Sequence, residues 1–218
     1  MAIGLALLVC SGAANAGDSI VFRDRFNGQL SEGWSWLRES KQNWRTGSNA
    51  LEVLIEPGNM WGRQNDARNI LLHALPDTSE TIDVSVTVSN APTHQYEQAD
   101  LVFYFDDSNM VKVGEELVDG KLSVVMGREE KDRTRTISIT PLDSTTVRLR
   151  FVVQGDQIRG FFKTPTAITW KEVGVCDWPK PENKQTAWVS LQFYQGAPNV
   201  KHWVRVTDFE IARFKAQR

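Results

Sequence analysis

Cysteine is scarce in this sequence. Its 218 residues include only Cys10 and Cys176. Because Cys10 lies in a segment that we expect to be removed, the mature chain would hold one cysteine and no internal disulfide. Asp177 and Trp178 follow Cys176, and no histidine is near it in the sequence. We therefore interpret Cys176 as a partly buried structural thiol.

An excess of charge of either sign is also missing. The chain has 25 Lys and Arg residues against 27 Asp and Glu residues, which gives a formal net charge of −2. Proteins that bind nucleic acid concentrate basic residues on one face. The balance therefore argues against a nucleic acid partner.

Motifs for nucleophilic and transition-metal chemistry are missing as well. The sequence has no G-x-S-x-G turn, no H-x-H pair and no C-x-x-C pair, and its three histidines are His73, His94 and His202. A serine nucleophile needs the first of these patterns in many hydrolases, and zinc sites often show the others. We expect each histidine to lie on a strand face or at the surface.

An apolar run near the N-terminus, residues 3–9, is too short to span a membrane. It is followed by Ala14-Asn15-Ala16, which matches the A-x-A pattern of signal peptide cleavage sites. The sequence therefore predicts a signal peptide over residues 1–16 and a secreted or periplasmic protein without membrane insertion. The mature part, residues 17–218, has no dividing linker, and we expect it to form a single domain.

Helical periodicity is absent from the mature part, and alternation of apolar and other residues recurs instead. The alternating segments are residues 51–55, 82–88, 147–153 and 189–193. Turn-forming residues such as Pro57-Gly58-Asn59 and Asp119-Gly120 lie between such segments. This spacing predicts an all-β sandwich of two antiparallel sheets. We expect the last strand, over residues 201–214, to lie beside the first, over residues 20–26.

The stretch over residues 96–116, YEQADLVFYFDDSNMVKVGEE, predicts a β-hairpin with two different faces. Leu101, Phe103 and Phe105 would point to one face, toward a core. Gln98, Tyr104 and Lys112 would point to the other, where a polar ligand can reach them. The turn would be Asp106-Asp107-Ser108-Asn109, whose side chains hydrogen-bond their own backbone.

This hairpin resembles the signature of the DUF1349 family of concanavalin A-like domains, which are similar to the C-terminal domains of β-xylosidase-type glycosidases. The segments FRDRFNG and GWSWLRE near the N-terminus and RVTDFEI near the C-terminus support the resemblance. It implies a jelly-roll β-sandwich whose concave sheet face binds carbohydrate, an oligo- or polysaccharide, without cleaving it. The family usually has glycine where this chain has Asp100, which adds a carboxylate to that face.

Sugars offer apolar ring faces that stack on Trp and Tyr, and hydroxyl groups that hydrogen-bond to polar side chains. Side chains of both kinds occur on the predicted hairpin, on the flanking segments and on a late strand. The candidate ligand-binding residues are Trp36, Arg38, Trp61, Arg63, Gln98, Tyr104, Lys112, Glu115 and Gln192.

A structural calcium ion is the one cofactor that the sequence suggests. Asp24 and Asn27 lie at the end of the predicted first strand, and Asp208 lies in the predicted last strand. If these strands are neighbours, three oxygen ligands of the kind that Ca²⁺ prefers would converge. Related sandwich domains resemble this arrangement, with a cation near the termini.

Two other functions stay open at this stage. A glycoside hydrolase would need two carboxylates on the binding face, and Glu97, Asp100, Glu115 and Glu116 supply candidates. The E-x-D-x-E pattern of hydrolytic concanavalin A-like proteins does not occur, however, which disfavours catalysis. A structural or protein-interaction module would show a filled or apolar face instead.

Overall fold

The computed structural model describes residues 19–76, 78–182 and 186–214. This part of the chain contains fifteen strands and one short 3-10 helix, η1 (Lys41–Asn43). None of its helices is long and apolar enough to cross a membrane. The predicted signal peptide, residues 1–16, lies outside the described residues.

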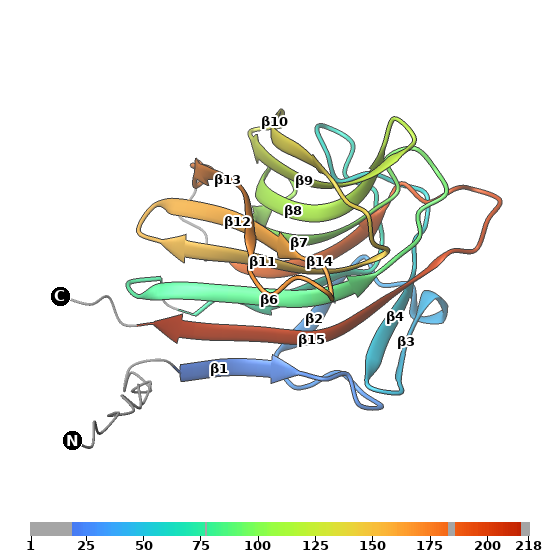
Figure 1. The fold of residues 1–218 in the computed structure, drawn as a ribbon, viewed down its shortest axis with the longest axis horizontal. Coiled ribbons are helices and arrows are strands. Elements are labelled where there is room, and N and C mark those ends of the chain that lie inside the picture. The colour runs from blue at the N-terminus through green and yellow to red at the C-terminus, as the bar shows by residue number, and fades with distance from the viewer. Residues whose placement is uncertain (1–18, 77, 183–185, 215–218) are drawn as a thin grey trace, which may run out of the picture.

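The strands form two antiparallel sheets that face each other (Figure 1). In spatial order, the eight-stranded sheet consists of β13 (Lys171–Asp177), β12 (Gln157–Lys163), β11 (Thr146–Gln154), β6 (Thr81–Ser89), β15 (Trp203–Phe214), β4 (Ala50–Leu54) and β3 (Trp44–Gly47), with β1 (Ser19–Asp24) also paired to β15. The seven-stranded sheet consists of β10 (Arg133–Pro141), β9 (Lys121–Glu130), β8 (Asn109–Val118), β7 (Gln98–Asp106), β14 (Trp188–Tyr194), β5 (Ile70–Ala74) and β2 (Trp34–Leu37). The predicted β-sandwich with jelly-roll architecture is therefore confirmed.

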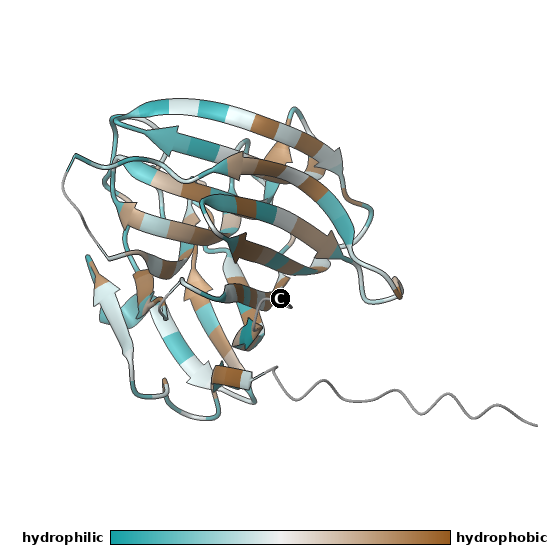
Figure 2. Cartoon of the chain, turned by 90° about the vertical axis from the view of Figure 1, so that its left-hand side faces the viewer, coloured by the Kyte–Doolittle hydropathy of each residue, from teal (hydrophilic) through white to brown (hydrophobic). Residues whose placement is uncertain are grey.

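The main core fills the space between the sheets. Hydrophobic and hydrophilic residues alternate along many of the strands (Figure 2), because successive side chains of a strand point to opposite faces. Leu101, Phe103 and Val113 of the seven-stranded sheet are buried in this core together with Val84 and Phe151 of the other sheet. We call the core side of the seven-stranded sheet its inner face and the opposite side its outer face.

The first and last strands are neighbours, as the sequence predicts. Strand β1 runs antiparallel to β15, with Asp24 opposite Phe209 and Ser19 opposite Arg213 (Figure 1). This pairing places the two ends of the described chain at the same edge of the sandwich.

A long connection crosses from one sheet to the other between β4 and β5. We call residues 55–69 the covering loop, because its Met60 packs on the outer face of the seven-stranded sheet against Val102, Met110 and Tyr194. The base of the loop is held by β14, whose following residue Gln195 donates its N–H to the Gly58 carbonyl at 3.0 Å. The outer face therefore has its own small buried cluster, separate from the main core.

Candidate functional site

The register of β7 and β8 brings the predicted polar residues of the hairpin to the outer face. Gln98 lies opposite Glu116, and Val102 lies opposite Lys112. Directly opposite residues of an antiparallel pair point to the same face. The prediction that Gln98 and Lys112 share a face is therefore confirmed, and their side chains hydrogen-bond directly, with the Lys112 ammonium as the donor.

Lys112 is the centre of the polar contacts on this face. Its ammonium donates a hydrogen bond to the Glu116 carboxylate at 3.0 Å and lies 3.8 Å from the Asp100 carboxylate. Its side chain is only 4% exposed. The Trp61 ring centroid lies 5.1 Å from the same nitrogen, which is within the range of cation–π attraction.

Burial and charge act in opposite directions on this pair of side chains. Burial would lower the pKa of Lys112, but the charges of Asp100 and Glu116 outweigh it, and the pKa lies above its ordinary value. Burial raises the pKa of Asp100 to about 7, against the opposing effect of the Lys112 charge. Lys112 therefore stays a cation at neutral pH.

A hollow of about 450 Å³ opens on the outer face beside Lys112. It lies where the covering loop, the β7–β8 hairpin and strands β9 and β10 meet. Its lining residues are Asn59, Trp61, Tyr96, Gln98, Lys112, Glu116, Val118, Asp119, Val125, Thr136, Ile139 and Gln195. Three of the residues predicted from the sequence, Trp61, Gln98 and Lys112, are thus brought together.

Trp61 forms one wall of the hollow because β9 makes room for it. A Cβ atom at Gly127 would lie 2.5 Å from Cη2 of the Trp61 ring, so only glycine allows this close approach. The next residue of the loop, Gly62, donates its N–H to the Glu129 carboxylate at 3.0 Å. The ring is therefore fixed to β9 both by packing and by the backbone of its own loop.

Tyr96, two residues before the start of β7, also lines the hollow, and the residue is 47% exposed. Its backbone has a φ of 65°, a left-handed conformation that non-glycine residues adopt rarely. The Tyr96 carbonyl accepts a hydrogen bond from Gln98 at 2.8 Å, and its N–H donates to the Leu117 carbonyl at 2.8 Å. These contacts hold an accessible aromatic ring at the mouth of the hollow.

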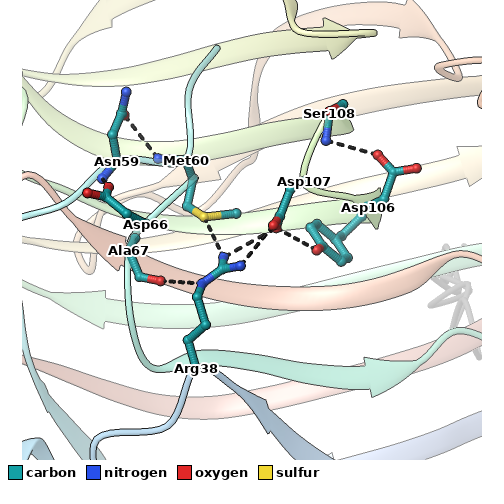
Figure 3. A network of polar contacts seen from close by, with 9 residues as sticks. Arg38, Asn59, Met60, Asp66, Ala67, Asp106, Asp107 and Ser108 are labelled. Carbon is teal, nitrogen blue, oxygen red and sulfur yellow. Dashed lines mark hydrogen bonds and ion pairs between the residues drawn. The ribbon is translucent and has the colours of Figure 1, made fainter. Parts of the chain in front are cut away.

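Arg38 and Tyr104, also predicted to bind a ligand, instead bind the turn of the hairpin, and Arg38 ties the covering loop to that turn (Figure 3). The Arg38 guanidinium donates to both oxygens of Asp107, at 2.8 and 3.2 Å, and to the Ala67 carbonyl at 2.7 Å. The Tyr104 hydroxyl donates to Asp107 at 2.8 Å. Desolvation, together with the charge of Asp107, raises the pKa of Tyr104, so the phenol stays protonated.

Trp36 and Glu115 lie on the inner face, which corrects the expectation that they face a ligand. Trp36 is paired with the core residue Leu71, and its ring centroid lies 4.9 Å from that of Trp44. Glu115 is paired with Ala99 and is fully buried. Alternation explains both placements, since Trp36 shares the face of Leu71, and Glu115 lies one residue from the outer-face residue Glu116.

The two remaining candidates lie near the hollow without lining it. Gln192 lies in β14 on the outer face, opposite Asp100 of β7, and is fully buried. Arg63 is exposed on the covering loop two residues after Trp61. Neither side chain is among those that line the hollow.

Two of the predicted calcium ligands, Asp24 and Asp208, lie in the neighbouring strands β1 and β15, and Asn27 follows β1. Asp24 is buried, and its carboxylate accepts hydrogen bonds from the N–H groups of Phe26, Ser31 and Trp34, at 2.6, 2.9 and 2.8 Å. Asn27 and Asp208 are exposed. Within the described residues, no group of three His, Cys, Asp or Glu side chains is placed to hold a metal ion. The calcium site stays a prediction.

Several residues of the hollow, including Asn59, Tyr96 and Asp119, are not among the candidates predicted from the sequence. A signal existed for two of them. Asp119 precedes Gly120 in a predicted turn, and Asn59 follows Pro57-Gly58, so both were expected in loops, where binding residues concentrate. Tyr96 gave no such signal, because its position depends on the turn before β7.

Solved structures with this fold include carbohydrate-active proteins. The GH43 protein BlXynB from Bacillus licheniformis matches with a TM-score of 0.74 at 15% identity, over 89% of this chain and 39% of its own. The xylan β-1,4-xylosidase from Bacillus halodurans matches with 0.73 at 18% identity, over 88% and 38%. This chain thus spans about two fifths of the length of these two proteins.

A further structure is similar over nearly its whole length. A functionally unknown protein from Saccharomyces cerevisiae matches with a TM-score of 0.64 at 15% identity, over 82% of this chain and 95% of its own.

No curated protein matches the sequence. The family described as "Protein of unknown function (DUF1349)" matches residues 36–211. These residues cover most of the chain and include the β7–β8 hairpin, and the protein therefore belongs to the DUF1349 family.

Proposed function

We propose that this protein binds carbohydrate non-catalytically in the hollow on the outer face of the seven-stranded sheet. The observation that carries the proposal is the combination of two aromatic side chains, Trp61 and Tyr96, with a polar floor made by Gln98, Lys112 and Glu116. Stacking on aromatic rings and hydrogen bonds to hydroxyl groups are the two contacts that a sugar ring requires.

The size of the hollow suits a small part of a glycan. Its volume of about 450 Å³ falls within the ~300–1,000 Å³ of typical ligand pockets. The polar floor is held in place before any ligand arrives, because Gln98 and Glu116 are both hydrogen-bonded to Lys112. Such preorganisation lowers the entropic cost of binding.

The structural neighbours support a carbohydrate-related role. One is named as a xylan β-1,4-xylosidase and another as a GH43 protein. At 15% and 18% identity these likenesses concern the fold, so the proposal rests on the hollow itself, and the neighbours guide the choice of glycans to test.

The test is a glycan-array screen followed by titration calorimetry with the best ligand. Removing the exposed ring in Tyr96→Ala should cost about 1–2 kcal/mol, which is a loss of roughly 5- to 30-fold in affinity. Trp61→Ala should lose at least as much. Trp170→Ala is the control, because that ring faces Arg150 and Lys163 in another part of the molecule and should leave the affinity unchanged.

Two results would speak against the proposal. Equal affinity in the parent, Tyr96→Ala and Trp61→Ala proteins, all shown to be folded, would place the site elsewhere. Binding to none of the glycans would favour a protein-interaction module.

A glycoside hydrolase is the rival that the hollow itself suggests, because Glu116 and Asp119 both line it. Two carboxylates on one sugar site are what glycosidic cleavage requires. Glu116, however, is ion-paired with Lys112 at 3.0 Å. Under our proposal, incubation with any glycan that binds should release no new reducing ends. Release that is lost in Glu116→Gln would establish the hydrolase instead.

A further inference from the structure

We propose that the hollow selects sugars without negative charge, preferring amino sugars to neutral ones and excluding uronic acids and sulfated sugars. This inference rests on the proposed carbohydrate binding and names the class of ligand. It follows from how the charged groups of the hollow are arranged.

The only cation among the lining residues is already occupied by protein acceptors. A lysine ammonium has three N–H groups, and those of Lys112 face three acceptors: Gln98 and Glu116, which are hydrogen-bonded to it, and Asp100 at 3.8 Å. With its side chain 4% exposed and two of its three N–H groups hydrogen-bonded to Gln98 and Glu116, Lys112 offers at most one donor to an acidic ligand. It acts as a positioning residue that orients Glu116 and Gln98.

The charged groups that remain for a ligand are acceptors. Glu116 uses one carboxylate oxygen for Lys112, and among the described residues no hydrogen bond engages the other. Asp119 is exposed, and one of its carboxylate oxygens accepts a hydrogen bond from Gln95 at 3.1 Å. Its second oxygen is therefore available to a ligand. A ligand that donates hydrogen bonds, through hydroxyl or ammonium groups, therefore fits these two positions.

The balance of charge points the same way. Two carboxylates, Glu116 and Asp119, line the hollow against one ammonium, Lys112, and the Asp100 carboxyl group lies 3.8 Å from that ammonium. A carboxylate or sulfate group on a ligand would meet net negative charge at a partly desolvated site, where repulsion is stronger than in water.

An amino group gains from the same surroundings. A protonated amine is attracted both by the carboxylates and by the faces of aromatic rings, and Trp61 and Tyr96 supply two such rings. We therefore expect affinity to decrease from amino sugars to neutral sugars to acidic sugars. The difference between the two extremes should be at least about tenfold at low salt.

In the experiment, residues 17–218 are titrated at pH 6 and low salt with three β-1,4-linked tetrasaccharides. These are the tetrasaccharides of glucosamine, of glucose and of mannuronic acid. The glucosamine compound should bind most tightly and the mannuronic acid compound least. Asp119→Asn removes one charge and keeps a residue type that tolerates the φ of 49° at this position. It should reduce the ratio between the two extremes several-fold.

Two further variants sharpen the test. Glu116→Gln should also reduce the ratio, while Asp156→Asn, which removes an exposed carboxylate outside the hollow, should leave it unchanged. If the mannuronic acid compound binds as tightly as the glucosamine compound, the inference is wrong, but the proposed function is unaffected. The same conclusion follows if the ratio is unchanged in Asp119→Asn. Failure of all three compounds to bind overturns the inference, and failure of the whole glycan screen overturns the proposed function as well.

Discussion

Asp100 occupies space that Gly114 leaves open on the neighbouring strand. The two residues are directly opposite in the β7–β8 pair, and a Cβ atom at Gly114 would lie 1.6 Å from Oδ1 of Asp100. The position of the Asp100 carboxylate near Lys112 therefore depends on Gly114 of β8, which has no side chain.

Gly114→Ala should destabilise the protein by about 1–3 kcal/mol, the usual cost of overpacking a close-packed site. The double variant Asp100→Gly/Gly114→Ala should recover much of this loss, because the clashing carboxylate is gone. Urea unfolding followed by circular dichroism measures both. Gly47→Ala is the control, since a Cβ there would meet no atom within 4 Å. A double variant as unstable as Gly114→Ala would show that the backbone, and not Asp100, limits the site.

Glu115 should make the stability of the protein depend on pH. It is fully buried on the inner face, and desolvation, together with the charge of Glu97, raises its pKa from 4.5 to about 9. Between these two values the folded state holds a proton that the unfolded state has released. Stability should therefore fall as pH rises through this window, by up to about 1.4 kcal/mol per pH unit for one proton.

The variant Glu115→Gln keeps the shape of the protonated acid and cannot ionise. It should be more stable than the parent at pH 8, with the difference shrinking toward pH 5. Thermal melts at several pH values measure this, and the comparison with the parent separates Glu115 from His202 and Glu97, which hydrogen-bond each other nearby. Glu182→Gln, at a side chain that is 78% exposed, should leave the pH profile of the parent unchanged. Parallel profiles for the parent and Glu115→Gln would contradict the prediction.

The faces of the central hairpin could be predicted from the sequence because they depend on local alternation alone. The alternation predicts Leu101, Phe103 and Phe105 on the core face and Gln98, Tyr104 and Lys112 on the other, and the structure keeps every one of these on the expected face. The same rule, read with the observed register, puts Glu116 beside Lys112 and turns Glu115 inward. The register could not be fixed beforehand, since it depends on the bulge near the turn, between Tyr104 and Asp106.

The path of the covering loop could not be predicted, because it depends on contacts between segments that are distant in the sequence. Trp61 reaches the outer face only where Gly127 removes a side chain from β9. The inner-face position of Trp36 could not be predicted for a related reason, since an edge strand of four residues does not show from its own sequence which side faces the core. Gly127, a glycine inside a strand, is the local sequence feature that indicates a close approach of another segment.

Export is the prediction that concerns the N-terminal segment. Because an apolar run is followed by Ala14-Asn15-Ala16, cleavage after Ala16 should leave a mature protein that begins at Gly17. Mass spectrometry of the protein recovered from the medium or the periplasm measures its N-terminus. Ala16→Lys should block cleavage, whereas Asn15→Gln should not. Exported protein that still begins with Met1 would refute the prediction.

Arg38 and Arg63 provide a matched pair for the role of the covering loop. Arg38 binds Asp107 and the Ala67 carbonyl with its guanidinium, and its side chain is 27% exposed (Figure 3). Arg38 follows β2 and holds the covering loop from outside, whereas Arg63 is an exposed residue of the loop itself. Arg38→Ala should cost about 1–3 kcal/mol, because the Ala67 carbonyl and the Asp107 carboxylate lose the hydrogen bonds of the guanidinium, and Asp107 keeps only that of the Tyr104 hydroxyl. Arg63→Ala should stay within about 0.5 kcal/mol of the parent, as surface substitutions usually do.

Hydrogen exchange gives the Arg38 prediction a local measurement in addition to global stability. Loss of the Arg38 contacts should release the loop from the hairpin turn, so that amides of residues 59–67 exchange faster while those of β7 and β8 keep their protection. Arg38→Lys should restore little, because an ammonium cannot form the two parallel hydrogen bonds that a guanidinium makes with a carboxylate. Unchanged exchange over residues 59–67 in Arg38→Ala would mean that the anchors at Gly62 and Gln195, whose N–H groups bind Glu129 and the Gly58 carbonyl, hold the loop without it.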